Sequence, residues 1–158
     1  MLLAGCYENE ALEVAKDVDL ERLEGRWYEI AKLPRHSQRD CARTTVTYER
    51  RASDEFRMLT DCQTPNEASD VAHGEAKLIV PDQAEPAKLA LDFGFYKGEH
   101  WIVEVGADHR YVVIGHPTRQ YLWILSRQHS LDEQTLDGVI DRARAQQFPV
   151  ENLEFTEQ

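Results

Sequence analysis

Short runs of apolar and β-branched residues alternate with polar turns along most of the chain. Eight such runs follow one another, at residues 27–33, 44–49, 56–62, 71–80, 87–93, 100–105, 111–115 and 122–127. The breaks between them carry residues typical of turns, such as Pro65-Asn66, Pro81-Asp82 and residues 106–108 (GAD). The pattern therefore predicts eight short strands and an all-β fold.

One amphipathic helix is predicted near the C-terminus. Four apolar residues recur there at helical spacing and form a single stripe: Leu136, Val139, Ile140 and Ala143. Ser130 and Glu133 have the spacing of a capping box, so Ser130 is expected to be the N-cap, and the helix is expected to end before Pro149. The stripe predicts packing against the outside of the sheet, and residues 153–156 are expected to add a short final strand.

Eight regularly spaced strands are typical of a sandwich or of an up-and-down barrel. Closing the sheet removes its exposed edges, and an eight-stranded barrel is just wide enough to hold one small ligand. A chain of 158 residues suits one domain with one core. Residues 20–158 are expected to form that domain, and the polar, acidic stretch within residues 1–19 is expected to be a tether.

Composition and charge narrow the function classes. The chain has 18 Lys and Arg residues against 29 Asp and Glu residues, a net charge of −11. Nucleic acid is therefore not an expected partner, because phosphate backbones attract basic proteins. No run of about 18 apolar residues is present, which is the length that a membrane-spanning helix needs.

Catalytic and metal-binding motifs are missing from the sequence. Six histidines are spread through different loops and strands, without a metalloprotease, hydrolase or P-loop motif. Cys41 with the nearby His36 would make a nucleophile pair, and a disulfide with Cys62 is the alternative that uses both cysteines. No paired Cys/His spacing indicates zinc. We therefore expect no catalytic residue, no metal and no cofactor.

Two longer motifs carry a resemblance to a known family. Residues 25–31 (GRWYEIA) resemble the opening strand of lipocalins, and residues 121–127 (YLWILSR) resemble the last barrel strand. Asp108 matches the family's middle motif in the turn before the seventh strand, although its neighbours depart from it. From about residue 19 to residue 156, the chain resembles the bacterial outer-membrane lipoprotein type of lipocalin. The resemblance implies an antiparallel eight-stranded up-and-down barrel with one C-terminal α-helix outside.

The resemblance also implies structural roles at the closed end of the barrel. Trp27 would plug that end, and Arg127 would lie across its ring as a cation over an aromatic face. The guanidinium would also bind nearby carbonyls. Gly25 and Asp108 belong to the same structural motifs, so these residues are expected to support the barrel without contacting a ligand.

The three cysteines point to the bacterial envelope. Residues 3–6 (LAGC) resemble a lipobox, which implies lipidation of Cys6, and Tyr7 after it favours the outer membrane. In the barrel topology, Cys41 precedes the second strand and Cys62 ends the third, so both fall at the open rim. A disulfide there requires an oxidising compartment such as the periplasm.

The resemblance places a ligand inside the barrel or at its rim. The candidate ligand-binding residues are Trp123, Tyr121, Glu29, Ala31, Phe93, Phe95 and Tyr96. By alternation, Glu29 and Ala31 share the inward face of Trp27. Glu29 either turns outward at a bulge or anchors a polar head group or a water molecule, and Trp123 faces either the cavity or the helix.

Further residues have alternative roles. Basic residues at the rim are candidates for an anionic head group: Arg35, His36, Lys97 and Arg119. In the sixth strand, the more apolar set of Trp101, Val103 and Val105 faces either the cavity or the helix.

The expected function is to bind and store or transport a fatty acid, lysophospholipid or similar membrane-derived lipid, without catalysis. The protein is expected as a monomer or homodimer, anchored through Cys6 and facing the periplasm. One alternative is a small lipocalin-fold enzyme that acts through Glu29 or Glu104. Another is a structural envelope lipoprotein whose barrel is filled by side chains.

Overall fold

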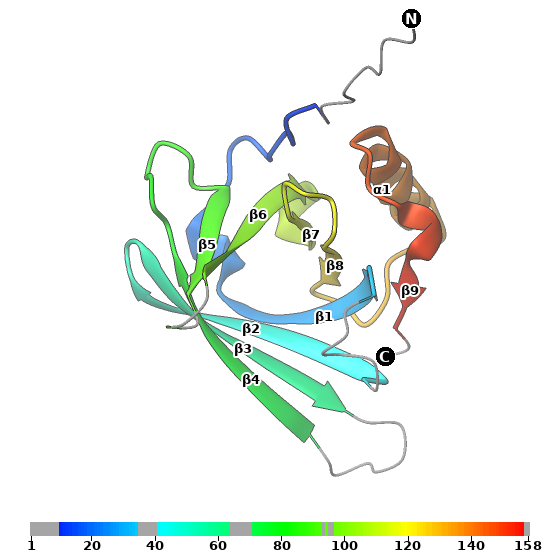
Figure 1. The fold of residues 1–158 in the computed structure, drawn as a ribbon. Helices are drawn as coiled ribbons and strands as arrows, with labels where there is room; N and C mark the ends of the chain where they lie inside the picture. The colour runs from blue at the N-terminus through cyan, green and yellow to red at the C-terminus, as the bar shows by residue number, and fades with distance from the viewer. Residues whose placement is uncertain (1–9, 35–40, 64–70, 93, 95–96, 157–158) are drawn as a thin grey trace, which may run out of the picture.

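The computed structural model describes residues 10–34, 41–63, 71–92, 94 and 97–156. Eight antiparallel strands form a closed barrel (Figure 1): β1 (Gly25–Lys32), β2 (Arg43–Ala52), β3 (Glu55–Gln63), β4 (Val71–Ile79), β5 (Lys88–Asp92), β6 (Lys97–Val105), β7 (Tyr111–Gly115) and β8 (Leu122–Ser126). Each strand pairs with the next, and both β2 and β8 pair with β1, which closes the sheet. The predicted up-and-down barrel is confirmed, with each strand end within three residues of its expected position.

The closed end of the barrel is filled by large apolar side chains. Along β2, for example, Val46 and Tyr48 are buried while Thr47 between them faces outward. The side chains of Trp27, Phe56 and Leu78 are fully buried in the same cluster. A short 3-10 helix, η1 (Leu20–Leu23), packs its two leucines onto this cluster and closes the end.

The predicted helix is α1 (Glu133–Ala145), and it lies outside the barrel beside β7 and β8 (Figure 1). Its stripe packs on a second apolar cluster, in which Val139 and Ala143 are buried. The expected N-cap is wrong: the cap is Asp132, whose carboxylate accepts a hydrogen bond from the Thr135 backbone N–H. Arg110 reaches the same corner, with its guanidinium 3.6 Å from Asp132 and 2.9 Å from the Thr135 hydroxyl. This tertiary contact favours Asp132 over Ser130.

Short elements complete the chain. A 3-10 turn, η3 (Ala107–His109), joins β6 to β7, and η4 (Val150–Asn152) follows α1. The final strand β9 (Glu154–Phe155) pairs with the end of β1 at Ala31 and Lys32. The pairing of β2 with β1 ends at Tyr28, and β9 pairs with the same edge of β1 beyond that point.

Residues 10–19 differ from the expected tether, because they pack along the barrel. Leu12 is buried in the cluster beneath α1, and the Ala15 backbone N–H donates to the Ile102 carbonyl at 2.9 Å. Glu13 and Gln146 exchange two hydrogen bonds of 2.8 and 3.2 Å. Apolar residues among the acidic ones allow this segment to bury a face. Residues 1–9, with the proposed lipidation site Cys6, lie outside the described residues.

Arg119 in the β7–β8 loop fastens this segment to the barrel. It is 7% exposed, and its guanidinium donates to the backbone carbonyls of Glu10, Pro117 and Gln146. Arg119, one of the candidate rim bases for an anionic head group, does not take that role, because its side chain is buried and donates to these three carbonyls.

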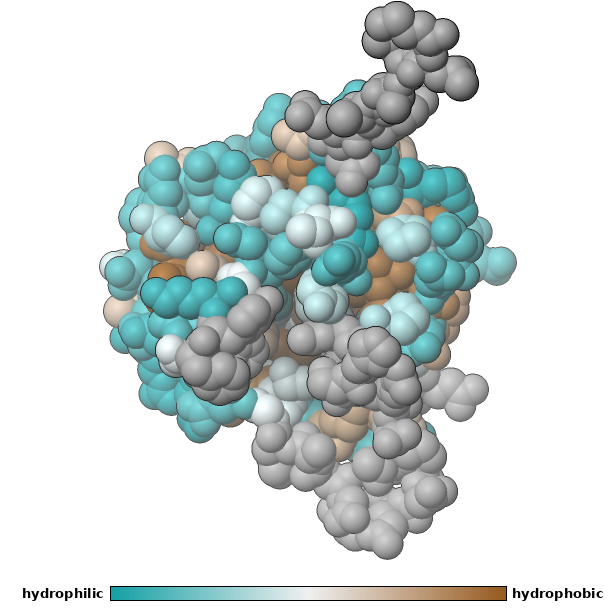
Figure 2. All heavy atoms as spheres, viewed as in Figure 1, coloured by the Kyte–Doolittle hydropathy of each residue, from teal (hydrophilic) through white to brown (hydrophobic). Residues whose placement is uncertain are grey.

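The face of the molecule seen in Figure 2 is mainly polar. Hydrophilic residues predominate among the coloured atoms of Figure 2. Within the described ranges, the only α-helix is neither long nor apolar enough to cross a membrane.

Candidate functional site

The barrel interior holds a cavity of about 50 Å³. Side chains from seven of the eight strands line it: Glu29, Thr44, Val46, Tyr48, Met58, Thr60, Leu91, His100, Ile114, Trp123 and Leu125. Its wall is mixed, with an apolar part and a polar part. Space for a few water molecules or for one end of a larger molecule is available here, since one water needs about 10–15 Å³ by this measure.

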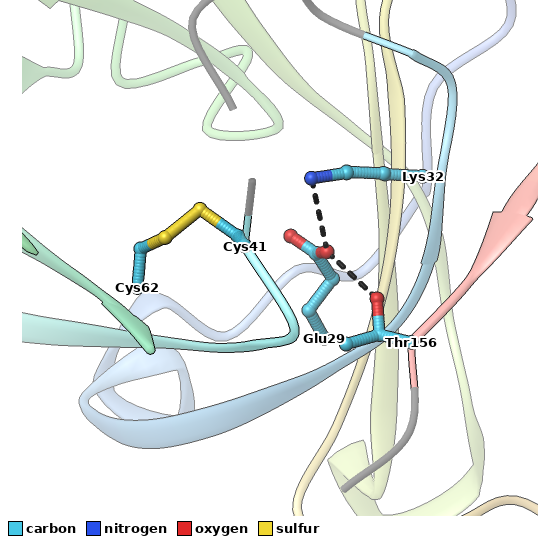
Figure 3. Close-up of a disulfide and its surroundings, with 5 residues drawn as sticks. All are labelled: Glu29, Lys32, Cys41, Cys62 and Thr156. Atoms are coloured by element: carbon cyan, nitrogen blue, oxygen red, sulfur yellow. Dashed lines mark hydrogen bonds and ion pairs between the residues drawn. A yellow bond between two sulfur atoms is a disulfide. The ribbon is translucent and has the colours of Figure 1, made fainter. Parts of the chain in front are cut away.

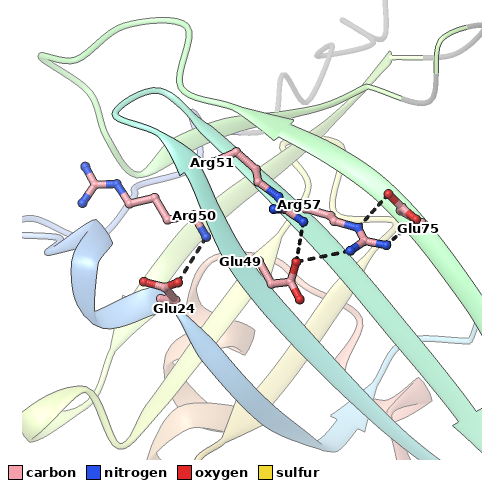
Figure 4. Close-up of polar contacts among 6 residues, drawn as sticks. All are labelled: Glu24, Glu49, Arg50, Arg51, Arg57 and Glu75. Carbon is pink, nitrogen blue, oxygen red and sulfur yellow. Dashed lines mark hydrogen bonds and ion pairs between the residues drawn. The ribbon is translucent and has the colours of Figure 1, made fainter.

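A larger depression lies on the outer face of β3, β4 and β5, with a volume of about 740 Å³. Its charged side chains bind one another. Arg57 lies between Glu75, at 2.8 Å, and Glu49, at 3.3 Å (Figure 4). These contacts lower the pKa of Glu75 and raise that of Arg57, mainly through their shared hydrogen bond. The depression is an open, self-paired surface, so we assign the candidate site to the barrel interior.

Tyr48 and His100 form a hydrogen bond across the cavity. The Tyr48 hydroxyl lies 2.8 Å from His100 Nε2, and both side chains are buried. Burial raises the pKa of Tyr48 well above its usual range, which keeps the phenol neutral. His100 also lies beside Trp123, with ring centroids 6.1 Å apart. Sequence reasoning missed Tyr48, although the alternation of β2 places it inward.

Glu29 faces the interior, as the alternation from Trp27 along β1 predicts, and a bulge in β1 comes directly after it. The extra residue lies between Glu29 and Ala31 in the pairing with β8. Glu29 is 1% exposed, accepts a hydrogen bond from the Thr156 hydroxyl at 2.9 Å, and lies 3.8 Å from the Lys32 ammonium (Figure 3). Of the two alternatives for Glu29, the inward one holds.

The same bulge corrects the expectation for Ala31. After the extra residue, alternation along β1 is reversed, so Ala31 turns outward into the cluster beneath α1. It is therefore not a cavity residue. The Lys32 side chain is on the opposite, inner face of the sheet, where Lys32 is the register partner of Trp123 in β8.

Trp123 lines the cavity, while Leu122 and Ile124 on either side of it pack beneath the helix. The Tyr121 ring stacks on Trp123, with centroids 6.0 Å apart and an interplanar angle of 13°. Tyr121 itself is not among the residues that line the described cavity. Tyr121 directly precedes β8, so its ring lies beside Trp123 at the end of the barrel where β8 begins.

The remaining rim candidates fall into two groups. Some lie outside the described residues: Phe93, Phe95, Tyr96, Arg35 and His36. Lys97, at the start of β6, is exposed.

A second bulge, in β6, moves Glu104 out of the interior. The shift lies between Ile102 and Glu104, so His100 and Ile102 face inward while Glu104 faces outward. The Glu104 carboxylate binds Arg142 of α1 at 2.6 Å and the Tyr111 hydroxyl at 2.9 Å. The expectation that Glu104 is a cavity carboxylate is therefore wrong.

The bulge also determines which face of the sheet each of the apolar residues Trp101, Val103 and Val105 occupies. Trp101 and Val103 pack on the cluster beneath α1, whereas Val105 packs on the interior cluster.

The closed end has the expected arginine stack. The Arg127 guanidinium lies 3.7 Å from the centroid of the Trp27 ring. The Trp27 indole N–H donates to the Leu23 carbonyl at 2.8 Å. Gly25 has a φ of +108°, and a Cβ there would lie 3.0 Å from an Arg127 nitrogen. Asp108 has a left-handed backbone in η3, and its carbonyl accepts from Arg22 at 2.9 Å.

The predicted disulfide is confirmed. Cys41 and Cys62 are bonded, with their Cα atoms 5.3 Å apart, and they link the chain before β2 to the end of β3 (Figure 3). Cys41 is therefore not a free nucleophile. Across the part of the chain that the structure describes, no group of three or more His, Cys, Asp or Glu side chains is arranged to hold a metal ion.

These features define a β-barrel with an internal cavity and with Arg127 stacked on Trp27 at the closed end. The lipocalin-like domain family matches residues 18–158, and the chain belongs to this family. Temperature-induced lipocalin-1 of Arabidopsis thaliana is 29% identical over 160 residues, which cover 96% of this chain and 85% of that protein. Outer membrane lipoprotein Blc of Vibrio cholerae is 25% identical over 161 residues, covering 100% of this chain and 94% of that protein.

Solved structures agree on the fold. Per a 4, an allergen from cockroaches, superposes with a TM-score of 0.71 at 17% identity, covering 92% of each chain. Insecticyanin of Manduca sexta has a TM-score of 0.69 at 20% identity, covering 93% of this chain and 84% of that one. At these identities the likeness supports the architecture alone.

Proposed function

We propose that the protein binds a small hydrophobic or amphipathic molecule in the barrel interior and stores or carries it, without catalysing a reaction. The cavity that Trp123 lines is the observation that carries this proposal. Met58, Leu91 and Ile114 supply apolar surface on the same wall. Burial of an apolar chain against such surface contributes about 0.8 kcal/mol per methylene.

Fatty acids and lysophospholipids are the ligand classes to test first, as the family resemblance implies. The cavity of about 50 Å³ is smaller than the roughly 300–1,000 Å³ of a typical ligand pocket. A long chain therefore requires side chains such as Met58 and Trp123 to change rotamer. Met is flexible and well suited to such a change.

We also propose a bacterial envelope location, with Cys6 lipidated and the barrel facing the periplasm. The Cys41–Cys62 disulfide supports an oxidising compartment. The relatives named outer membrane lipoprotein, from Vibrio cholerae and Escherichia coli, support the same location. Labelling cells with a radioactive fatty acid tests it: label is expected on the wild type in the membrane fraction and not on Cys6→Ser.

The ligand proposal is tested by native mass spectrometry of the purified protein followed by titration of tryptophan fluorescence with fatty acids and lysophospholipids. Saturable quenching at micromolar concentration is expected. It should be lost in Trp123→Phe and kept in Trp101→Phe, because Trp101 packs on the cluster outside the barrel. A flat titration and no co-purifying ligand would refute binding and favour a barrel filled by side chains.

A further inference from the structure

The wall of the cavity carries several hydrogen-bonding side chains among its apolar ones. Besides Trp123, five of its eleven lining side chains carry hydrogen-bonding groups: Glu29, Thr44, Tyr48, Thr60 and His100. All five lie on strands of the barrel wall and face the same space. Small-molecule pockets use a few such groups to fix the orientation of the ligand.

The Tyr48–His100 bond crosses the barrel from wall to wall. Tyr48 is on β2 and His100 on β6, and three strands separate β2 from β6 in either direction around the closed sheet. The hydrogen bond of 2.8 Å therefore spans the interior. On the closed-end side of this pair lie packed side chains such as Trp27 and Ile102, which are at most 1% exposed.

We propose that the Tyr48–His100 pair receives an uncharged hydrogen-bonding group of the ligand, so that the ligand is an amphiphile with a hydroxyl or carbonyl at its inner end. This inference rests on the proposed function and specifies the chemistry of the molecule that is bound. The apolar part of the ligand lies toward the open end, beside Trp123 and Tyr121, whose rings stack.

The chemistry of the pair suits such a group. A phenol hydroxyl donates one hydrogen bond and accepts up to two, so Tyr48 retains hydrogen-bonding capacity beyond its bond to His100. A cavity of about 50 Å³ has room for one polar end group and its first carbons. A pure hydrocarbon would leave the remaining hydrogen-bonding capacity of the Tyr48 hydroxyl unused, which is unfavourable in a buried site.

An anionic end group is disfavoured in the same space. The Glu29 carboxylate lines the cavity and is paired with Lys32 at 3.8 Å, and neither Lys nor Arg is among the residues that line the described cavity. A ligand carboxylate would therefore lose its hydration in a poorly solvated site without a Lys or Arg counter-charge on the cavity wall. A fatty acid is therefore expected to bind less well than the alcohol or ketone of the same length.

The test is a titration of the wild-type protein with 1-decanol, 2-decanone and decanoate at pH 7. Affinities are compared relative to the partition of each probe between water and octanol. We expect the two neutral probes to bind at least tenfold more tightly than decanoate on this scale. Equal or tighter binding of decanoate would overturn the inference while leaving the proposed function intact. Failure of every probe to bind would overturn both.

The matched variant is Tyr48→Phe, which removes only the hydroxyl. It is expected to weaken 1-decanol by about three- to tenfold, the effect of one lost hydrogen bond, and to leave decanoate unchanged. Tyr28→Phe is the control, because Tyr28 is on the outer face with its ring 4.0 Å from that of His129. An equal loss for both probes in Tyr48→Phe would refute the inference. The ranking in the wild type remains decisive if the variant does not fold.

Discussion

The guanidinium of Arg127 lies 3.7 Å from the centroid of the Trp27 ring, and this stack joins the last barrel strand to the first. The same guanidinium donates to three backbone carbonyls, those of Arg22, Glu24 and Arg26, at 2.6 to 2.9 Å. One side chain thus holds η1 and the start of β1 against the end of β8. These segments are about 100 residues apart in sequence, so the contact reinforces the pairing of β1 with β8 that closes the barrel.

Replacing Arg127 is expected to destabilise the fold strongly. Arg127→Ala should lower the free energy of unfolding by about 2–4 kcal/mol, since it removes the stack and several charge-assisted hydrogen bonds. Arg127→Lys should recover only part of the loss, because an ammonium lacks the planar fork. Urea denaturation measures both. Arg144→Lys is the control, because Arg144 forms an exposed ion pair with Asp141 and should change stability by less than about 0.5 kcal/mol. A small effect of Arg127→Ala would show that the stack is not stabilising.

The disulfide is expected to stabilise the hairpin of β2 and β3. Cys41 and Cys62 are 21 residues apart, and closing a loop of that size contributes about 3 kcal/mol. Reductant should therefore lower the melting temperature of the wild type by roughly 6–12 °C. The double variant Cys41→Ser/Cys62→Ser should melt at the reduced temperature, and reductant should not change it further. A reductant effect in the double variant would assign the shift to another cause.

The strands were predictable because each one carries its own signal. Each strand is encoded by its own alternating or apolar residues and by the turn residues on either side. The motifs around Trp27 and Arg127 then indicated that the strands close into a barrel. The cysteine pair followed from that topology. Tyr48 was not predicted as a site residue, because nothing in β2 distinguishes a polar cavity residue from a core tyrosine with a bonded hydroxyl.

The bulges in β1 and β6 could not be predicted. A bulge adds one residue to one strand, and this reverses alternation for every residue after it. Residues 29–32 (EIAK) give no sign of the extra residue, so Ala31 was expected inside and lies outside. The N-cap and the packing of residues 10–19 were missed for a related reason, because partners distant in sequence, such as Arg110 and Gln146, decide them.

The buried pair Glu29–Lys32 is expected to be energetically coupled. Both side chains are at most 4% exposed, and removing one partner leaves the other charge in a poorly solvated place. Glu29→Gln and Lys32→Met should each lower the free energy of unfolding by about 3–5 kcal/mol. The double variant should be less destabilised than the sum of the two, with a coupling of about 1–3 kcal/mol in a double-mutant cycle by urea denaturation. Additive effects would show that the two charges act independently.

The N-cap of α1 is expected to give a pH-dependent contribution to stability. Hydrogen bonds from the Thr135 backbone N–H and hydroxyl lower the pKa of Asp132. A lowered folded-state pKa stabilises the protein above the unfolded pKa of about 4, and the contribution is lost as the pH falls through the folded value. Asp132→Ala should therefore melt a few degrees below the wild type at pH 7, with a gap that narrows below pH 4. Ser130→Ala should have the melting temperature of the wild type. A lower melting temperature in Ser130→Ala than in Asp132→Ala would identify Ser130 as the N-cap.

Arg119 is expected to control how firmly residues 10–18 lie on the barrel. Its guanidinium joins the Glu10 carbonyl to those of Pro117 and Gln146, and it is almost fully buried. Arg119→Ala should expose this segment to limited proteolysis and speed its amide hydrogen exchange at least tenfold, including the Ala15 N–H that bonds to Ile102. Exchange in β2 and β3, which do not contact Arg119 in these hydrogen bonds, should stay unchanged and serves as the internal control. Faster exchange throughout the barrel would instead show that Arg119 supports the whole fold, and unchanged exchange at Ala15 would show that the apolar contacts of Leu12 hold the segment without it.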